Sequence, residues 1–448
     1  MTSVQELINA AAAREKAATT AANDATGLAG AKLPLFTTSY PAELSTCDTE
    51  LVKDPWQVDQ DTSYGPGASI ADPFPAKAPH QGSLPGRYTQ ASIKELEEMI
   101  AAAKDELGDR VKILGHFYQR DEIVKFADFV GDSFNLAQAA KQHPEAEAFV
   151  FCGVHFMAET ADILSTPEQA VILPNLAAGC SMADMATIDQ VERCWSELQA
   201  ALADATPAAA KAPLVPVTYM NSSADIKAFC GRNGGIVCTS SNARTVLEWV
   251  FERGERVVFL PDQHLGRNTA KAMGIPEEQI IMWNPRLELG GNTPEQVRDA
   301  KVILWNGFCS VHKRFTVAQI EHARAEFPGV RVIVHPECPA PVVDAADASG
   351  STELIRREVE ASKPGDVLAI GTEINLVNRL ASQYPDRTIF CLDPVVCPCS
   401  TMYRIHPAYL AWTLESLCAG ETPNRITVEE GVAADARVAL ERMLAARP

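Results

Sequence analysis

One pattern occurs three times along this chain of 448 residues. In each copy an apolar run of the kind that forms a buried strand ends in a polar triplet, a turn rich in serine and threonine follows, and a cysteine comes later. Cys180 lies 64 residues after His116, and Cys399 lies 64 residues after His335, whereas Cys309 lies 90 residues after the start of its triplet. Equal spacing in two copies and an insertion in the other indicate a structural unit repeated three times.

Each copy alternates apolar runs with segments of helical spacing, which is the pattern of a parallel α/β sheet. We expect three strands per copy, over residues 111–114, 148–152 and 171–173, then 214–219, 257–260 and 302–305, then 330–334, 367–370 and 388–392. Such units pack helices on both faces of the sheet through right-handed crossovers. The sequence therefore predicts three homologous three-layer α/β/α domains around a pseudo-threefold axis, with the triplets and cysteines at the carboxyl ends of strands, where ligands bind.

The domain boundaries follow from the same repeat. The predicted parts are an N-terminal extension with an alanine-rich helix and a Pro/Gly-rich arm (1–85), three α/β repeats (86–180, 181–309 and 310–400) and C-terminal helices packing on the core (401–448). The second repeat is longer because of residues 231–235 and 266–300, which we interpret as loop insertions.

The charge of the chain limits its partners. A net charge of −19 argues against binding to nucleic acid or to an anionic membrane, because both need basic surface. No apolar run approaches the roughly 18 residues of a membrane span, and no signal peptide is recognisable at the N-terminus. We therefore expect a cytoplasmic protein that holds any anionic substrate with local donors.

Cys180, Cys309 and Cys399 share one phase of the repeat, so their thiols are expected to meet at the pseudo-threefold axis. Three thiolates without a fourth are the ligands of an iron–sulfur cluster with one iron left open for chemistry. No two of the three are close in sequence, which excludes a zinc ribbon with paired knuckles. Two alternatives stay open: each cysteine could be a small buried apolar residue, and Cys397 could replace Cys399 as the third ligand.

Two further sets of residues are expected to face the same centre. The serine and threonine turns precede helical segments, and a hydroxyl at a helix N-terminus either binds an anion or simply caps the helix. Residues two apart on a strand end share a face, so the triplets aim their first and third side chains at one pocket. The candidates are Ser133, Ser240, Ser351 and Thr352 from the turns, and His116, Tyr118, Tyr219, Asn221, His335 and Glu337 from the triplets.

Glu337 is the only carboxylate in the three triplets, and we assign it as the principal general base, with Tyr118 as its partner. His116 and His335 would orient the substrate, and Tyr219 would pass or donate a proton. The alternative is that these histidines and tyrosines are structural.

These residues carry a resemblance to a known family. The chain is similar to quinolinate synthases over about residues 88–445, in the motifs Gly115-His116-Phe117-Tyr118-Gln119, Gly131-Asp132-Ser133, Gly153-Val154-His155-Phe156-Met157-Ala158-Glu159-Thr160, Ala178-Gly179-Cys180-Ser181, Tyr219-Met220-Asn221-Ser222, Pro261-Asp262, Leu265-Gly266, His335-Pro336-Glu337-Cys338 and Gly350-Ser351-Thr352. The resemblance implies three α/β/α domains around a [4Fe–4S] cluster with one iron free of protein ligand. It also implies condensation of iminoaspartate with dihydroxyacetone phosphate to quinolinate, phosphate and water, in de novo NAD synthesis.

The resemblance also assigns residues. The cluster ligands fall on Cys180, Cys309 and Cys399, the last because the family pattern Cys-x-x-Met matches residues 399–402. Substrate and catalytic positions fall on the ten candidates from the turns and triplets. Transient contact with the enzyme that supplies iminoaspartate is implied as well.

Two other functions fit part of the pattern. A cluster-dependent hydro-lyase acting on a small hydroxy acid would share the open iron but would need no phosphate site. An iron–sulfur electron carrier or sensor would normally have four protein ligands and no need for six polar residues at strand ends.

Overall fold

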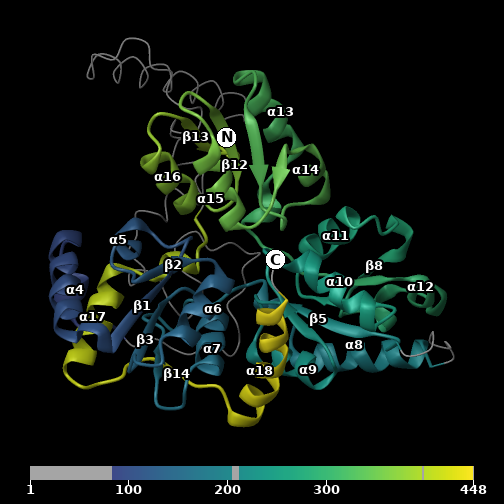
Figure 1. Ribbon diagram of the computed structural model, residues 1–448, viewed down its shortest axis with the longest axis horizontal. Helices are drawn as coiled ribbons and strands as arrows, with labels where there is room; N and C mark the ends of the chain where they lie inside the picture. Colours follow the sequence, from purple (N-terminus) through teal and green to yellow (C-terminus); the bar gives the residue numbers. More distant parts are fainter. Residues whose placement is uncertain (1–82, 204–210, 396–397, 447–448) are drawn as a thin grey trace, which may run out of the picture.

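The computed structural model describes residues 83–203, 211–395 and 398–446. The predicted N-terminal extension, apart from residues 83–85, and the alternative ligand Cys397 therefore lie outside the described residues. Within the described part, the chain forms three sheets with helices packed against them, arranged around a common centre (Figure 1). The fold is α/β with parallel strands predominating.

The three sheets share one strand order. Their orders are β14-β4-β3-β1-β2, β6-β5-β7-β9-β8 and β11-β10-β12-β13. All three contain four parallel strands in a common order, in which the second strand along the chain lies at an edge beside the first. The antiparallel β14 extends the first sheet, and the parallel β8 extends the second. The strands are β1 (Val111–His116), β2 (Phe129–Gly131), β3 (Ala148–Cys152), β4 (Ala170–Ile172), β5 (Val215–Tyr219), β6 (Ile236–Cys238), β7 (Val257–Leu260), β8 (Ile280–Trp283), β9 (Val302–Trp305), β10 (Arg331–Val334), β11 (Ala348–Ser349), β12 (Val367–Gly371), β13 (Thr388–Cys391) and β14 (Arg425–Ile426).

The nine apolar runs identified in the sequence all form strands, but the expectation of three strands per copy was one short in the first and third copies and two short in the second. Each sheet has an additional strand, β2, β6 or β11, directly before the serine and threonine turn. These strands have only two or three residues, and those of β2 and β11 are partly exposed. They therefore leave too short an apolar run to be recognised as strands from sequence.

The interpretation of residues 266–300 as a loop insertion was wrong. This segment contains the end of α11 (Gln263–Ala272), the strand β8 and the helix α12 (Pro294–Asp299), and β8 forms an edge of the second sheet beside β9. Trp283, at the end of β8, is buried against Gly290, which has φ +63°. A Cβ on Gly290 would lie 2.4 Å from the Trp283 ring, so the turn requires glycine.

Several helices begin at residues whose side chains cap them. In α4 (Ile93–Leu107), Ser92 and Glu95 form a capping box, and Leu96, Ile100 and Leu107 lie on the buried face. The other helices are α3 (Gly86–Thr89), α5 (Asp121–Val124), α6 (Ser133–Gln142), α7 (His155–Leu164), α8 (Ile188–Ala201), α9 (Ala224–Arg232), α10 (Ala243–Arg253), α13 (Val317–Glu326), α14 (Ala340–Ala345), α15 (Thr352–Ala361), α16 (Ile374–Gln383), α17 (Pro407–Cys418) and α18 (Glu430–Ala445).

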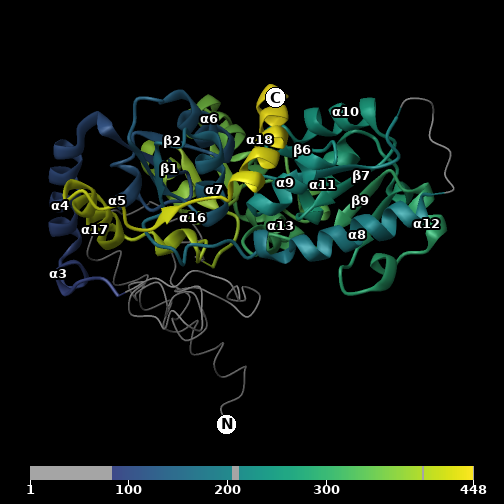
Figure 2. The same ribbon diagram turned by 90° about the horizontal axis from the view of Figure 1, so that it is seen from below.

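The C-terminal segment joins the first two sheets. Helix α17 packs along α4, β14 pairs antiparallel with β4, and α18 packs on α9 and β6 of the second sheet (Figures 1 and 2). One continuous core accordingly contains residues from the first sheet, the second sheet and this segment. The third sheet has a separate core, which also receives Phe117 from the first triplet. None of the helices in the described ranges is long and apolar enough to cross a membrane.

Candidate functional site

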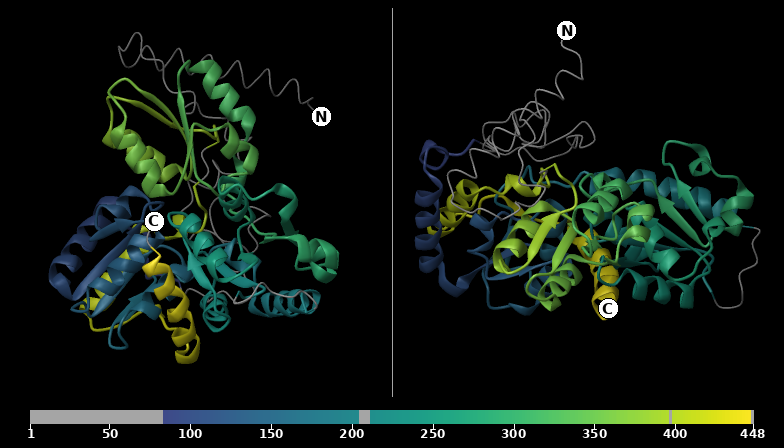
Figure 3. Two further views of the ribbon diagram at one scale, coloured as in Figure 1. Left: turned by 45° about the vertical axis from the view of Figure 1, so that its right-hand side comes forward. Right: turned by 90° about the horizontal axis from the view of Figure 1, so that it is seen from above.

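The three sheets lie around a common central region (Figures 1 and 3). Residues that follow strands of all three sheets line one cavity there. It encloses about 680 Å³, counting its opening to solvent. Twelve of the thirteen candidate residues line it: His116, Tyr118, Ser133, Cys180, Tyr219, Asn221, Ser240, Cys309, His335, Glu337, Thr352 and Cys399. The structure therefore brings together residues that are as much as 283 positions apart in the sequence.

Ser351 is the candidate that does not line the cavity. Its hydroxyl caps α15 by accepting a hydrogen bond from the backbone N–H of Leu354 at 3.3 Å. Thr352, the first residue of the helix, lines the cavity, and its buried Oγ1 has no hydrogen-bond partner among the described residues. In the first turn the cap is the Asp132 carboxylate, which accepts from Asn135, so capping does not engage Ser133.

Three cysteines meet in the cavity. Cys180, Cys309 and Cys399 are half-buried and close enough for their ionised forms to repel one another. Burial raises the pKa of each thiol, that of Cys399 to about 11, so the thiolates would need a nearby cation. The other described cysteines lie outside the cavity: Cys152, Cys194, Cys230, Cys238, Cys338 and Cys391 are buried in the fold, and Cys418 is half-buried on α17.

The first and third triplets fold into the same turn. The backbone N–H of Tyr118 donates to Nδ1 of His116 at 3.1 Å, and that of Glu337 donates to Nδ1 of His335 at 3.4 Å. The next amide in each turn donates to the carbonyl of the same histidine at 3.0 Å. The two histidines are almost fully buried, and burial lowers the pKa of each to about 3. Both rings are therefore neutral near pH 7. The two turns place Tyr118 and Glu337 at equivalent positions relative to their histidines.

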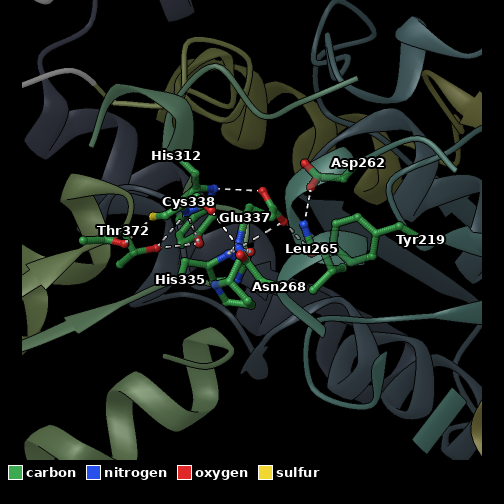
Figure 4. Close-up of polar contacts among 12 residues, drawn as sticks. Tyr219, Asp262, Leu265, Asn268, His312, His335, Glu337, Cys338 and Thr372 are labelled. Atoms are coloured by element: carbon green, nitrogen blue, oxygen red, sulfur yellow. Dashed lines mark hydrogen bonds and ion pairs between the residues drawn. The ribbon is translucent and has the colours of Figure 1, made fainter. Parts of the chain in front are cut away.

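Glu337 is held by a buried network (Figure 4). One carboxylate oxygen accepts from the Tyr219 hydroxyl at 2.6 Å, and the other lies 2.8 Å from His312 Nδ1. The His312 ring stacks on His335, with centroids 4.3 Å apart. Burial alone would raise the pKa of Glu337, but the two histidines and these hydrogen bonds outweigh burial and hold that pKa well below its usual range.

The network continues to Tyr118. The Tyr118 hydroxyl lies 2.8 Å from Thr372 Oγ1, which in turn lies 3.1 Å from His312 Nε2. Burial and the charge of Glu337 raise the pKa values of Tyr118 and Tyr219 well above 10, so both phenols keep their protons. A continuous chain of hydrogen bonds therefore connects two protonated phenols to one carboxylate.

Sequence analysis did not identify three residues of this region as candidates. Thr372 directly follows β12, which makes it part of the same strand-end pattern, and Asp262 belongs to the Pro261-Asp262 motif, so both carried a signal. His312 carried none, because it has no counterpart at this phase in the other copies. Its Nδ1 or Nε2, Cys309 Sγ and a Glu337 oxygen lie within 4.8 Å of one another, a spacing at which they could hold a metal ion.

The cavity offers uncharged hydrogen-bond donors to an anion instead of positively charged side chains. Among the described residues, its lining contains no lysine or arginine. Ser133 and Thr352, the first residues of α6 and α15, face it, as does Ser240 in the turn that leads into α10. Free N–H groups and hydroxyls at helix N-termini bind carboxylate and phosphate groups. The arrangement can therefore grip a small polyanion beside three thiols and a proton-transfer network.

Comparisons with known proteins agree with this geometry. Residues 98–445 match the family model described as quinolinate synthetase A protein. The quinolinate synthase of Corynebacterium glutamicum is 68% identical over 385 residues, which cover 86% of this chain and 96% of that protein. Those of a Nocardioides species and of Streptomyces coelicolor are 56% and 55% identical, over 81% of this chain and 92% and 91% of theirs. The chain therefore belongs to the quinolinate synthase family.

Proposed function

We propose that the central cavity condenses iminoaspartate with dihydroxyacetone phosphate to give quinolinate, phosphate and two molecules of water. The observation that carries the proposal is the convergence of three half-buried thiols, three helix N-termini and a carboxylate network on one cavity. The condensation needs each of these: a Lewis acid for dehydration, a grip on carboxylates and phosphate, and groups that move protons. A hydro-lyase acting on a small hydroxy acid would need no site for a phosphate group.

The cofactor in this proposal is a [4Fe–4S] cluster held by Cys180, Cys309 and Cys399. Thiolates are the usual ligands of such clusters, and these three thiols are buried enough to remain protonated unless a cation binds them. When bound, a cluster with three protein ligands supplies one open iron that polarises a hydroxyl or carboxylate of the substrate.

The substrates' anionic groups would be held by Ser133, Ser240 and Thr352 with the backbone N–H groups beside them. Asn221 and the neutral His116 and His335 would orient the carbon skeleton, because all three line the cavity. Hydrogen bonds from helix N-termini position an anion without placing a mobile cation next to the thiols.

Proton transfer would centre on Glu337. Its carboxylate is ionised and in contact with both Tyr219 and His312, so a proton taken from substrate carbon can reach it directly or through either partner. Tyr118 would donate a proton to a leaving hydroxyl and recover it through Thr372 and His312. Each step is then a short transfer between groups already hydrogen-bonded to one another.

We also propose that the three repeats, with the limits 86–180, 181–309 and 310–400, are homologous domains related by a pseudo-threefold axis through the cavity. The shared strand order and the matched turns after β1 and β10 support this.

Iminoaspartate is reactive, and direct transfer from the enzyme that supplies it would fit a cavity that opens at the centre of the molecule.

The test is to purify the full chain anaerobically, count iron and sulfide, and assay quinolinate from the two substrates. We expect one four-iron cluster per chain and quinolinate formation. Cys180→Ser, Cys309→Ser and Cys399→Ser should each lose cluster and activity, whereas Cys397→Ser and the matched control Cys194→Ser, from α8, should retain both. Loss of the cluster in Cys397→Ser but not in Cys399→Ser would overturn the ligand assignment.

A further inference from the structure

The turn that carries Tyr118 is held by a residue from the third sheet's helices. Arg379, on α16, donates from Nη1 to the Phe117 carbonyl at 2.9 Å and from Nη2 to the Gln119 carbonyl. Its Nε also pairs with Asp121 at 2.6 Å, and its side chain is only 11% exposed. Phe117 itself inserts into the core of the third sheet. The carbonyls before and after Tyr118 are thus both bound by one guanidinium from another sheet's layer.

The turn that carries Glu337 is held in a comparable way. Asn268, on α11 of the second sheet, donates from Nδ2 to the carbonyls of Pro336 and Cys338, each at 2.8 Å (Figure 4). These carbonyls flank Glu337, which follows β10 of the third sheet. Asn268 is buried, and its Oδ1 has no partner, so its only side-chain hydrogen bonds among the described residues are these two.

Each turn is therefore fixed by a side chain that the neighbouring sheet's helix supplies. Buried carbonyls need donors, and a donor that binds the carbonyls on both sides of one residue fixes the direction of that residue's side chain. We propose that Arg379 and Asn268 are positioning residues. Each is supplied by a neighbouring sheet's helix, and each fixes the direction of one side chain, Tyr118 for Arg379 and Glu337 for Asn268. This inference rests on the proposed function of those two side chains.

Two other side chains make the same bonds far from the cavity and serve as matched controls. Arg256 directly precedes β7, at the amino end of that strand and so at the end opposite the cavity; it donates twice to the Arg298 carbonyl, and its side chain is 13% exposed. Asn292, beside β8, donates from Nδ2 to the carbonyls of Met282 and Leu289. Neither lines the cavity. Arg256→Gln and Asn292→Asp should cost comparable stability without affecting turnover.

The experiment compares Arg379→Gln and Asn268→Asp with these controls in anaerobically purified holoenzyme. We expect iron and sulfide content to be retained and kcat to fall by roughly 10- to 100-fold, with a smaller change in KM, because misplacing a catalytic group by an ångström can cost that much. Arg379→Lys keeps the charge near His116 but replaces the planar fork, which binds the two carbonyls through separate nitrogens, with a single ammonium, so it should show most of the loss.

Hydrogen exchange gives a second measurement that does not depend on activity. In Arg379→Gln, the amide of Gln119, which donates to the His116 carbonyl, should exchange faster than in the parent protein. In Asn268→Asp the amide of Cys338 should do the same, while Arg256→Gln and Asn292→Asp should leave both unchanged.

The outcomes separate the possibilities. Unchanged exchange in both turns would overturn the inference, as would parental kcat in both variants, and full activity in Arg379→Lys would show that the charge alone matters. If the parent protein made no quinolinate, the proposed function would fail. The exchange measurement would then still decide whether the two residues hold the turns.

Discussion

The turns after β1 and β10 have the same backbone and opposite side-chain chemistry. In both, a neutral buried histidine accepts the backbone N–H of the residue two positions later. That residue is Tyr118 in one turn and Glu337 in the other. Burial raises the pKa of Tyr118, whereas His312, His335 and hydrogen bonds lower that of Glu337. The repeat therefore fixes the position of each group, and its neighbours fix whether the group carries a proton.

The turn after β5 shows what happens without the histidine. There the Ser222 hydroxyl donates to the Tyr219 carbonyl at 2.9 Å, and the fully buried Lys227 donates to the Ser222 carbonyl at 2.5 Å. Burial lowers the pKa of Lys227 to about 8. A second local arrangement thus places the Tyr219 hydroxyl against the same carboxylate, which indicates that the position of the side chain matters more than the contacts that hold its turn.

The largest effect is expected from removing the charge of Glu337. Glu337→Gln keeps the size of the side chain but cannot accept a proton, so kcat should fall by about 10²- to 10⁴-fold while cluster content and substrate binding persist. Steady-state kinetics with iron analysis measures this. Glu358→Gln, which removes a surface carboxylate paired with Arg331, is the matched control and should behave as the parent. Turnover near the parental rate in Glu337→Gln would move the base to a histidine.

A smaller loss is expected from the phenols. Tyr118→Phe and Tyr219→Phe keep the rings and remove one hydroxyl from each end of the network, and we expect kcat to fall by about 10²-fold for each. The double variant should lose less than the product of the two effects, since both phenols connect to Glu337 through one hydrogen-bonded chain. Fully multiplicative losses would show that the two turns act independently. Tyr384→Phe, at the end of α16, is the control.

The fold was predictable where the residues repeat. Nine strands follow from apolar runs, and the convergence of Cys180, Cys309 and Cys399 on one cavity follows from their common phase. The short strands β2, β6 and β11 were not recognised, because two or three residues form no distinctive period. The edge strand β8 was missed because its surroundings, rich in glycine, proline and charge, were interpreted as a loop insertion. Likewise, the choice between Ser351 and Thr352 depends on which residue begins α15, and sequence places helix ends only within a residue or two.

The lining of the cavity was predictable where its residues share one phase of the sequence pattern, and not where contacts come from other elements. His312, Arg379 and Asn268 come from different elements and act on turns distant in sequence. No periodicity relates them to the residues they hold. Such contacts depend on how helices pack between sheets, and only the folded chain shows that.

Removing the hydroxyls that face the cavity from the serine and threonine turns should raise KM moderately. Ser133→Ala, Ser240→Ala and Thr352→Val each remove a hydrogen bond to a charged group, which is worth about 1.5–3 kcal/mol, so KM should rise by roughly tenfold or more. Ser351→Ala should instead lower stability by about 1 kcal/mol through loss of its cap, with KM nearly unchanged. A KM increase in Ser351→Ala equal to that in Thr352→Val would show that the two hydroxyls act together on substrate.

The smallest effect tests whether the two histidine turns are energetically equal. His116 and His335 have pKa values of about 3 when folded, against about 6.5 in an unfolded chain. Between those values the unfolded chain takes up the protons that the folded chain refuses. Each histidine should therefore lower the free energy of unfolding as the pH falls from 6.5 towards 3, by up to about 1.4 kcal/mol per pH unit, and should have no such effect above pH 6.5.

Replacing either histidine by glutamine should remove its contribution to the change of unfolding free energy with pH. Denaturant midpoints of the parent, His116→Gln and His335→Gln, measured between pH 5 and 7, should give two equal and shallower slopes, and His322→Gln, an exposed site on α13, should give the parental one. Unequal slopes would mean that Arg379, which opposes the charging of His116, or His312, which opposes that of His335, makes the two environments differ. In that case the shared backbone would fix geometry alone, and the charge that each neighbouring sheet contributes would decide how strongly each ring resists protonation.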